Sequence, residues 1–297
     1  MQTILVTGGS GMIGSNFIKN LIHKPNIKVI SLYHKHQTNF ESVENICADI
    51  CDKKIVDLLS TFKFNVIIHC AAMTNISDCE NNPALAKKIN VSGSKNIVLL
   101  AKKNNSKIIY ISTDAVFKGD KGFYNETDKP NPQTVYGKTK LVAENFFLEN
   151  KGLVIRTNVF GKNNFLEKLT FAESIIETLN EKKTFSGFID AKFSPIFVSD
   201  LFYLTMRLIK KNATGIFHVG GSDKISKYEF AKQVAETFGL NIELVQKASV
   251  NSISSNICYP KDLTLDCNKL ISYLNEDIPS VKEGLIKFKK MLVLENG

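Results

Sequence analysis

The sequence lacks any apolar run long enough to cross a membrane. A transmembrane helix needs roughly 20 apolar residues in succession, and runs such as Val66-Ile67-Ile68 break after a few positions. The N-terminus also lacks a basic stretch, and its apolar run Ile4-Leu5-Val6 meets glycines too early for a secretory signal. These absences predict a cytoplasmic protein without a membrane-spanning segment.

Closely paired cysteines are absent as well. The sequence has six cysteines and none of them forms a C-x-x-C pair, the spacing that many zinc sites use. We therefore predict reduced thiols and no bound metal. The cysteines are Cys47, Cys51, Cys70, Cys79, Cys258 and Cys267.

Clustered positive charge is also missing, although the chain is basic overall. Lysine and arginine number 38 against 29 acidic residues, a formal charge of +9. The basic residues are scattered, and their densest groups, Lys102-Lys103 and residues 287–290, form no stripe interleaved with aromatic residues. This pattern argues against a nucleic-acid partner and leaves anionic small molecules as ligands.

Strand and helix patterns alternate through the first half of the 297 residues. Such alternation predicts an α/β fold, a Rossmann-type doubly wound parallel sheet. The predicted strands are residues 3–7, 28–32, 65–70, 107–112 and 153–158, and the helical patterns between them include residues 12–24, 84–103 and 135–149.

The regular alternation of strand and helix patterns ends after Gly161. We place a Rossmann domain at residues 1–160 and a smaller α+β domain at residues 161–297, and we allow for segments that return to the first domain. The second half shows helical patterns at 165–182, 199–211, 226–238 and 280–292, and a turn-rich stretch at 186–195.

A glycine-rich turn joins the first predicted strand to its helix. Gly8, Gly11 and Gly14 fit G-x-x-G-x-x-G. Glycines there let backbone N–H groups approach a pyrophosphate at the start of a helix, so we predict a dinucleotide site that includes Met12 and Ile13. The alternative is a tight turn that binds nothing.

The second predicted strand ends without the acidic residue that would bind an NAD ribose. No Asp or Glu precedes Glu41, and His34 and Lys35 stand near the expected position. Cations there favour a 2′-phosphate, so the sequence predicts NADP (NADPH) rather than NAD. The alternative is a basic surface loop.

Two further segments complete the predicted cofactor site. Asp49 and Ile50 follow a short predicted strand, where they would meet the adenine, although Asp49 could instead cap a helix. The small residues of Cys70-Ala71-Ala72 would let a cofactor lie against the backbone.

Tyr136 and Lys140 are four residues apart, so they share one face of the predicted helix. A nearby ammonium would lower the pKa of a phenol and make it an acid–base group. Thr113, at the end of the strand 107–112, would hold a substrate carbonyl against the tyrosine at the carboxyl edge of the sheet. Alone, the Tyr/Lys pair could be an ordinary exposed pair.

Taken together, these motifs resemble the extended short-chain dehydrogenase/reductases, and among them the dTDP-4-dehydrorhamnose reductases and related nucleotide-sugar 4-keto reductases. The resemblance covers nearly the whole chain. Its landmarks are Thr7-Gly8-x-x-Gly11-x-x-Gly14, Cys70-Ala71-Ala72, Ser112-Thr113-Asp114, Tyr136-x-x-x-Lys140, Arg156 to Gly161, Phe193 to Asp200 and Gly215 to Gly220.

The resemblance implies NADPH-dependent reduction of a 4-keto-6-deoxy nucleotide sugar for surface-polysaccharide synthesis. Tyr136 would protonate the ketone oxygen, Lys140 would bind the nicotinamide ribose, and Thr113 would hydrogen-bond the substrate oxygen. Thr74, Asp114 and Asn164 would also contact the nucleotide-diphosphate sugar, the second half would bind it, and Arg156 would be structural.

Departures from the family pattern narrow the range of reactions that the sequence predicts. Ala115 stands where dehydratases of the superfamily carry Glu and where the reductases usually carry Tyr. Dehydration is therefore disfavoured. A nucleotide-sugar epimerase, and a regulatory subunit resembling that of methionine adenosyltransferase, remain alternatives, and the sequence leaves the oligomeric state open, a homodimer included.

Overall fold

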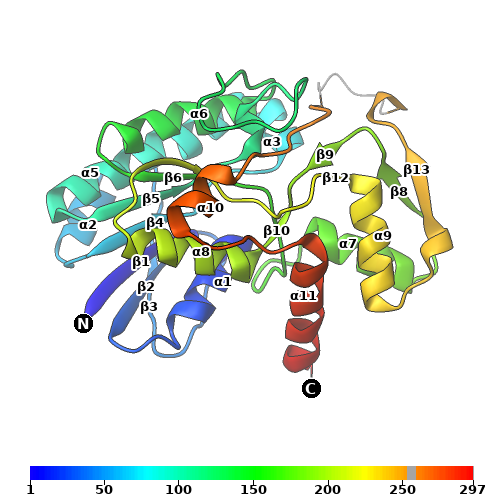
Figure 1. The fold of residues 1–297 in the computed structure, drawn as a ribbon. Coiled ribbons are helices and arrows are strands. Elements are labelled where there is room, and N and C mark those ends of the chain that lie inside the picture. Colours follow the sequence, from blue (N-terminus) through cyan, green and yellow to red (C-terminus); the bar gives the residue numbers. More distant parts are fainter. Residues whose placement is uncertain (253–258, 297) are drawn as a thin grey trace.

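The computed structural model describes residues 1–252 and 259–296 and is built around a parallel sheet of seven strands (Figure 1). The strand order is β11-β6-β5-β4-β1-β2-β3. This confirms the predicted Rossmann-type fold and its five predicted strands. The strands are β1 (Gln2–Thr7), β2 (Ile27–Tyr33), β3 (Glu44–Cys47), β4 (Val66–His69), β5 (Lys107–Ile111), β6 (Leu153–Arg156) and β11 (Gly215–His218).

Helices cover both faces of the sheet, because its strands alternate apolar side chains between two cores. In β1, Ile4 and Val6 face one apolar cluster and Leu5 faces the other. One face carries α2 (Ile55–Ser60), α5 (Ser94–Asn104) and α6 (Val135–Leu148), and the other carries α1 (Met12–Leu21) and α8 (Val198–Lys210). Between β4 and α5 lie α3 (Ile76–Asn81), α4 (Pro83–Lys87) and the π-helical segment η1 (Lys88–Gly93).

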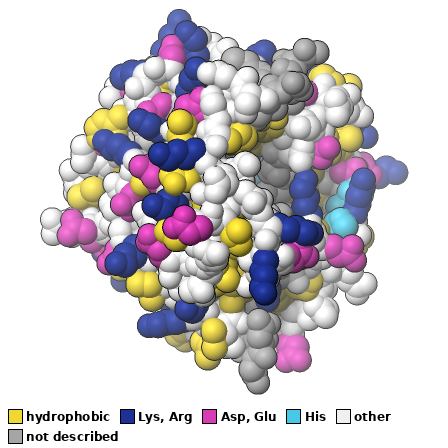
Figure 2. Space-filling model, turned by 90° about the vertical axis from the view of Figure 1, so that its right-hand side faces the viewer, with side chains coloured by type: hydrophobic (Ala, Val, Ile, Leu, Met, Phe, Trp, Pro, Cys, Tyr) yellow, Lys and Arg dark blue, Asp and Glu magenta, His cyan; other side chains and the backbone are white. Residues whose placement is uncertain are grey.

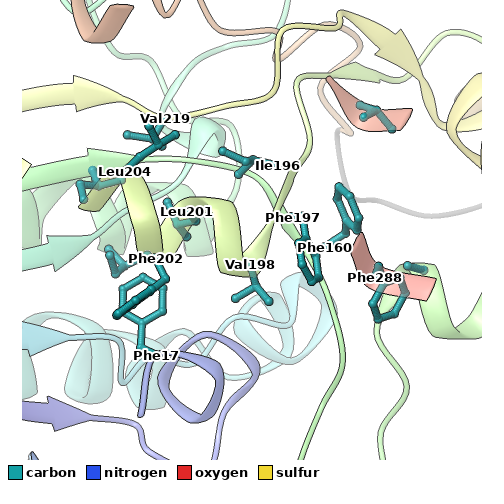
Figure 3. Close-up of a cluster of buried hydrophobic side chains, with 14 of the residues drawn as sticks. Phe17, Phe160, Ile196, Phe197, Val198, Leu201, Phe202, Leu204, Val219 and Phe288 are labelled. Atoms are coloured by element: carbon teal, nitrogen blue, oxygen red, sulfur yellow. The ribbon is translucent and has the colours of Figure 1, made fainter. Parts of the chain in front are cut away.

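Aromatic side chains fill the core between α1 and α8 and extend it to α11 (Val281–Asn296). Phe17 of α1 meets Phe202 of α8 edge to face, with ring centroids 5.3 Å apart (Figure 3). The ring centroid of Phe197 lies 5.9 Å from that of Phe288 in α11. Each such pair contributes about 0.5–1.5 kcal/mol beyond its buried area. The second pair holds the last helix against the short strand that precedes α8.

A second lobe forms from three short strand pairs and the helices packed on them. The strand pairs are β7 (Val159–Phe160) with β10 (Ile196–Phe197), β8 (Phe185–Phe188) with β13 (Val245–Ala248), and β9 (Lys192–Phe193) with β12 (Ile225–Ser226). The other elements are α7 (Phe171–Asn180), α9 (Lys227–Phe238) and the 3-10 turns η3 (Ile242–Leu244) and η4 (Val250–Ser252). Helix α10 (Asn268–Leu274) instead packs on β11 of the central sheet, where the ring of Tyr273 meets that of Phe217 edge to face.

Two predictions for the second half were wrong in detail. The helix predicted at 165–182 begins only at Phe171, because Thr170 and Glu173 form a reciprocal capping box that starts it there. The stretch 186–195, predicted to be turns, contains most of β8 and all of β9. Both strands are too short to show alternation in the sequence.

The second half also contributes to the first domain. Strand β11 lies beside β6 in the central sheet, and α8 packs on α1. Five cysteines are free thiols, and Cys258 lies outside the described residues. No helix in the parts of the chain that the structure describes is long and apolar enough to cross a membrane.

Candidate active site

The glycine turn packs against the end of β4 so closely that only glycine fits. Gly8 has φ +70°, and a Cβ there would lie 2.8 Å from the Ala71 backbone. A Cβ on Gly14 would lie 2.2 Å from the Gly8 carbonyl oxygen. Gly11 caps α1, whose first turn holds neither a side-chain cap nor an acidic residue. The helix N-terminus is therefore suited to an anionic group such as a pyrophosphate.

A cavity of about 450 Å³ opens beside this turn. It brings together most of the residues predicted to bind the cofactor, and Leu166 reaches it from the second half. Met12, Ile13 and Gly14 instead form the first turn of α1 behind it. The predicted residues in its wall are Gly8, Gly11, His34, Lys35, Asp49, Ile50, Cys70, Ala71 and Ala72.

The far end of the cavity is basic. His34 and Lys35 are exposed there, and Lys88 lines the same wall. Asp49 lines the cavity too, and the charges of His34 and Lys88 act on its carboxyl group. Burial acts to raise its pKa, but the Cys51 N–H together with His34 and Lys88 lowers it overall. Asp49 accepts from the Cys51 N–H at 2.9 Å and does not cap α2, whose N-cap is Lys54. On the face that Figure 2 shows, basic and acidic side chains are interspersed.

The end of β5 places two polar side chains at the carboxyl edge of the sheet. The Thr113 hydroxyl donates to Asp114 Oδ1 at 3.1 Å and accepts from the Ala115 N–H. Asn158, which follows β6, donates to Asp114 Oδ2 at 2.7 Å. Asp114 is only 2% exposed, and burial raises the pKa of its carboxyl group.

Helix α6 carries Tyr136 to this strand end. Thr134 caps the helix by accepting from the Gly137 N–H, and a Cβ on Gly137 would lie 2.2 Å from the Ala115 carbonyl oxygen. Only glycine permits this approach. Thr113 lies close enough to Tyr136 for the two hydroxyls to interact.

The Tyr136 phenol is held in its protonated form. Burial has the largest effect and raises its pKa, Thr113 acts in the opposite direction, and Asp114 adds to the rise. This differs from the downward shift expected from the sequence, because burial disfavours the phenolate more than nearby groups favour it. The half-buried phenol therefore carries its proton at neutral pH.

Lys140 connects the tyrosine to the cavity. Its ammonium donates to the Ile111 carbonyl oxygen at 2.7 Å and lies over the Tyr110 ring at 4.0 Å. Burial lowers the pKa of Lys140 to about 7, against the opposing effect of Glu144. Its charge in turn influences Cys70 in the cavity wall. Lys140 therefore lies beside the cavity, one helical turn from Tyr136 in α6.

A buried hydrogen-bonded chain supports the cavity floor. Burial lowers the pKa of His69 to about 3, so the ring is neutral. Thr7 Oγ1 accepts from the N–H groups of Cys70 and Ala71, and donates to His69 Nδ1 at 2.7 Å. The His69 Nε2–H then donates to Ser94 Oγ at 3.0 Å. These hydrogen bonds connect β1 to β4 beneath the residues that line the cavity.

Other predicted residues lie apart from this cluster. Asn164 accepts from the Lys19 ammonium and donates to Ser15 Oγ, both on α1. Thr74 is exposed between β4 and α3. Arg156 is buried and makes two hydrogen bonds to Glu144, at 3.0 and 2.7 Å, which confirms a structural arginine.

Sequence reasoning missed Asn158 and Gly137. Asn158 follows β6 as Thr113 follows β5, and adjacent parallel strands deliver their ends to one edge, so its position could have been inferred. Gly137 carries no such signal, because its close approach to the Ala115 backbone depends on how α6 packs.

Three comparisons with known proteins agree with this geometry. The RmlD substrate binding domain model matches residues 1–293. The probable low-salt glycan biosynthesis reductase Agl14 of Haloferax volcanii is 26% identical over 286 residues, 94% of this chain and 95% of the relative. Methionine adenosyltransferase 2 subunit beta of Rattus norvegicus is 31% identical over 284 residues, 91% of this chain and 81% of that protein.

A solved structure shares the whole architecture. The dTDP-4-dehydrorhamnose reductase of Bacillus anthracis, crystallised with NADP, is 28% identical with a TM-score of 0.85, and the match covers 98% of this chain and 100% of that one. These similarities confirm the resemblance found in the motifs. The chain therefore belongs to the RmlD substrate binding domain family and is an NAD(P)-dependent oxidoreductase of the short-chain dehydrogenase/reductase type.

Proposed function

We propose that this chain uses NADPH to reduce the 4-keto group of a nucleotide-linked 4-keto-6-deoxy sugar for surface-polysaccharide synthesis. The observation that carries the proposal is the placement of Tyr136 beside Thr113, on the helix whose Lys140 acts on Cys70 in the wall of the cavity at the glycine turn. A ketone reductase needs a proton donor at the oxygen that becomes a hydroxyl, and Tyr136 meets this requirement.

In the proposed reaction, Tyr136 donates its proton to the ketone oxygen while Thr113 holds that oxygen by a hydrogen bond. NADPH would supply the hydride when it is bound in the cavity. Lys140 binds the nicotinamide ribose, and its ammonium stabilises the phenolate that remains after proton transfer. Asp114, held by Thr113 and Asn158, contacts the sugar.

The basic end of the cavity supports a preference for NADPH. His34 and Lys35 are exposed where the ribose 2′-phosphate would lie, and a carboxylate is missing from the end of β2. A 2′-phosphate gains charge-assisted hydrogen bonds from such cations. The NADP-bound relative from Bacillus anthracis agrees with this preference.

Residues 161–297 are proposed as the sugar-nucleotide domain. Leu166 of this half already lines the cavity, and Asn164 lies on α1 beside the glycine turn, where a diphosphate would pass. Thr74 is exposed and available to the substrate. Free thiols at the described cysteines support a cytoplasmic location.

The test measures NADPH oxidation with a panel of 4-keto-6-deoxy nucleotide sugars, in parallel with NADH. The wild type should turn over at least one sugar and prefer NADPH, and Tyr136→Phe should lower kcat by roughly 100-fold or more, because the proton donor is lost. NADPH binding without turnover of any sugar would contradict the proposed reaction.

A second candidate role is that of a regulatory subunit, favoured by the 31% identity to methionine adenosyltransferase 2 subunit beta. Such a protein would copurify with a larger enzyme and alter its activity. The Tyr136→Phe variant would leave that effect unchanged, which separates the two roles.

A further inference from the structure

Lys140 is a buried ammonium with few hydrogen-bonding partners in the protein. Only 3% of the residue is exposed, so its charge has lost most of its contact with bulk water. Within residues 1–252 and 259–296, its side chain donates one hydrogen bond, to the Ile111 carbonyl oxygen at 2.7 Å, and forms no ion pair. A buried charge is costly unless neighbouring groups stabilise it, so groups of the protein must do so here.

The ring of Tyr110 lies against that ammonium. Lys140 Nζ is 4.0 Å from the ring centroid, and Tyr110 is only 1% exposed. A cation over an aromatic face is attracted by the quadrupole of the ring, and the attraction is larger where both groups are shielded from water. Tyr110 and Ile111 are consecutive residues of β5. One strand end therefore supplies both the aromatic face and the carbonyl oxygen that contact the ammonium.

A buried stack of rings fixes the position of Tyr110. The centroid of its ring lies 4.5 Å from that of Phe147 and 5.6 Å from that of His69, with interplanar angles of 15° and 21°. Phe147 lies on α6, about two helical turns after Lys140, and His69 is neutral. Because these interior rings are closely packed, the Tyr110 ring cannot move away from the ammonium without disturbing its neighbours.

The protonation of Lys140 is balanced between opposing effects. Burial lowers its pKa to about 7, while Glu144 and Cys70 act in the opposite direction. The Glu144 carboxylate is also bound by Arg156 and by the Ser112 hydroxyl group. A further stabilising contact of modest strength therefore decides how much of the side chain is charged near pH 7. The titratable groups around Lys140 are Tyr136 and Glu144 on α6, Tyr110 on β5, and His69 and Cys70 at the end of β4.

We propose that Tyr110 is a positioning residue for the reaction: the face of its ring, together with the Ile111 carbonyl oxygen, takes the place of bulk water around the Lys140 ammonium and keeps it charged and fixed in position. The inference rests on the proposed function, because Lys140 is taken to bind the nicotinamide ribose and to stabilise the Tyr136 phenolate. Stabilising an anion requires the charged form of the lysine. Tyr110 acts through Lys140, since it does not itself line the cavity.

The experiment follows the titration of Lys140 in three variants. Tyr110→Leu removes the aromatic face, and Tyr110→Phe keeps it. Phe147→Leu is the matched control, because it takes a ring out of the same buried stack but leaves the ring that contacts the ammonium. The titration is measured by NMR in protein labelled with ¹³C-lysine, and the Lys140 signal is assigned by its absence from Lys140→Met. Thermal melting reports the folding of each variant.

Tyr110→Leu should raise the acid dissociation constant of the Lys140 ammonium by roughly 10- to 30-fold, the range expected for a buried cation–π contact. Tyr110→Phe and Phe147→Leu should leave that constant within about threefold of the wild type. In assays with a keto sugar, kcat of Tyr110→Leu should then decline at a lower pH than in the wild type, because the ammonium loses its proton earlier. An unchanged constant in Tyr110→Leu, or an equal rise in Phe147→Leu, would overturn the proposal.

Fluorinated phenylalanines at position 110 keep the test decisive if Tyr110→Leu does not fold. Fluorine withdraws electrons from the ring face and nearly preserves its shape, so the dissociation constant of the ammonium should rise with each added fluorine. A constant that does not change along this series would contradict the proposal.

The titration also separates this proposal from the proposed function, because it needs no substrate. If the wild type reduces no keto sugar, the proposed function fails. The dependence of the Lys140 titration on the Tyr110 ring still decides whether that ring keeps the ammonium charged.

Discussion

Gly137→Ala tests whether the close approach of α6 to the end of β5 is what unites Tyr136 with Thr113. The added Cβ would lie 2.2 Å from the Ala115 carbonyl oxygen and 2.9 Å from Pro132 Cβ, whereas ordinary contacts begin at 3.4 Å. Backbone cannot yield as a flexible side chain does, so the start of α6 must move by roughly 1 Å.

That displacement sets the size of the effect. Overpacking costs about 1–3 kcal/mol, and the higher helix propensity of alanine offsets about 1 kcal/mol of it. The loss of stability should therefore be modest. A misplacement of about 1 Å in a reacting group costs roughly 100-fold in rate. We therefore expect a large fall in kcat/KM for the keto sugar together with only a modest fall in the melting temperature.

The assay is steady-state NADPH oxidation, with thermal melting and NADPH binding measured on the same preparations. Lys138→Ala is the matched control, because Lys138 is the exposed next residue of the same helix turn. NADPH binding should change little in both variants, since Gly137 lies outside the cavity wall. A Gly137→Ala enzyme with unchanged melting temperature and kcat/KM within about twofold of the wild type would refute the reasoning.

Three other perturbations follow from the structure. Arg156→Leu leaves a buried carboxylate unpaired and should lower the free energy of unfolding by about 3–5 kcal/mol, whereas Lys28→Met breaks an exposed pair and should cost at most about 1 kcal/mol in urea unfolding. In the wild type, the pKa of Lys140 is about 7 in the folded protein and higher in the unfolded chain, so the unfolded chain binds more protons between about pH 7 and pH 10. The free energy of unfolding therefore rises with pH in this range, and Lys140→Met should weaken that rise. Lys35→Asp should lower the preference for NADPH over NADH by roughly 10- to 100-fold, while Lys24→Asp, an exposed control, should leave that ratio unchanged.

Each of these has an outcome that would contradict it. If Arg156→Leu and Lys28→Met lowered the free energy of unfolding equally, burial would not decide how much these two ion pairs contribute to stability. A Lys140→Met protein with the wild-type pH dependence of unfolding would contradict the lowered pKa, although Lys227, also shifted to about 7, shares in the rise. An unchanged cofactor ratio in Lys35→Asp would move the 2′-phosphate away from this end of the cavity.

The sequence predicted what depends on local pattern. Parallel strands such as β4 are buried on both faces, so they appear as continuous apolar runs between helical periods. The spacing of the glycines predicted the turn between β1 and α1, because few other residue types can adopt its backbone geometry. Tyr136 and Lys140 share a helix face by the helical repeat alone, and Thr113 follows from its place after a strand.

Tertiary structure decided what depends on segments far apart in the chain. Asn158 reaches Asp114 because β5 and β6 are neighbours in the sheet. The charge of Lys227, at the start of α9, also acts on this carboxylate, an influence between distant segments that no local period encodes. Burial also reversed the direction expected for the Tyr136 pKa, since desolvation is set by every segment packed around a group and cannot be read from its neighbours in sequence.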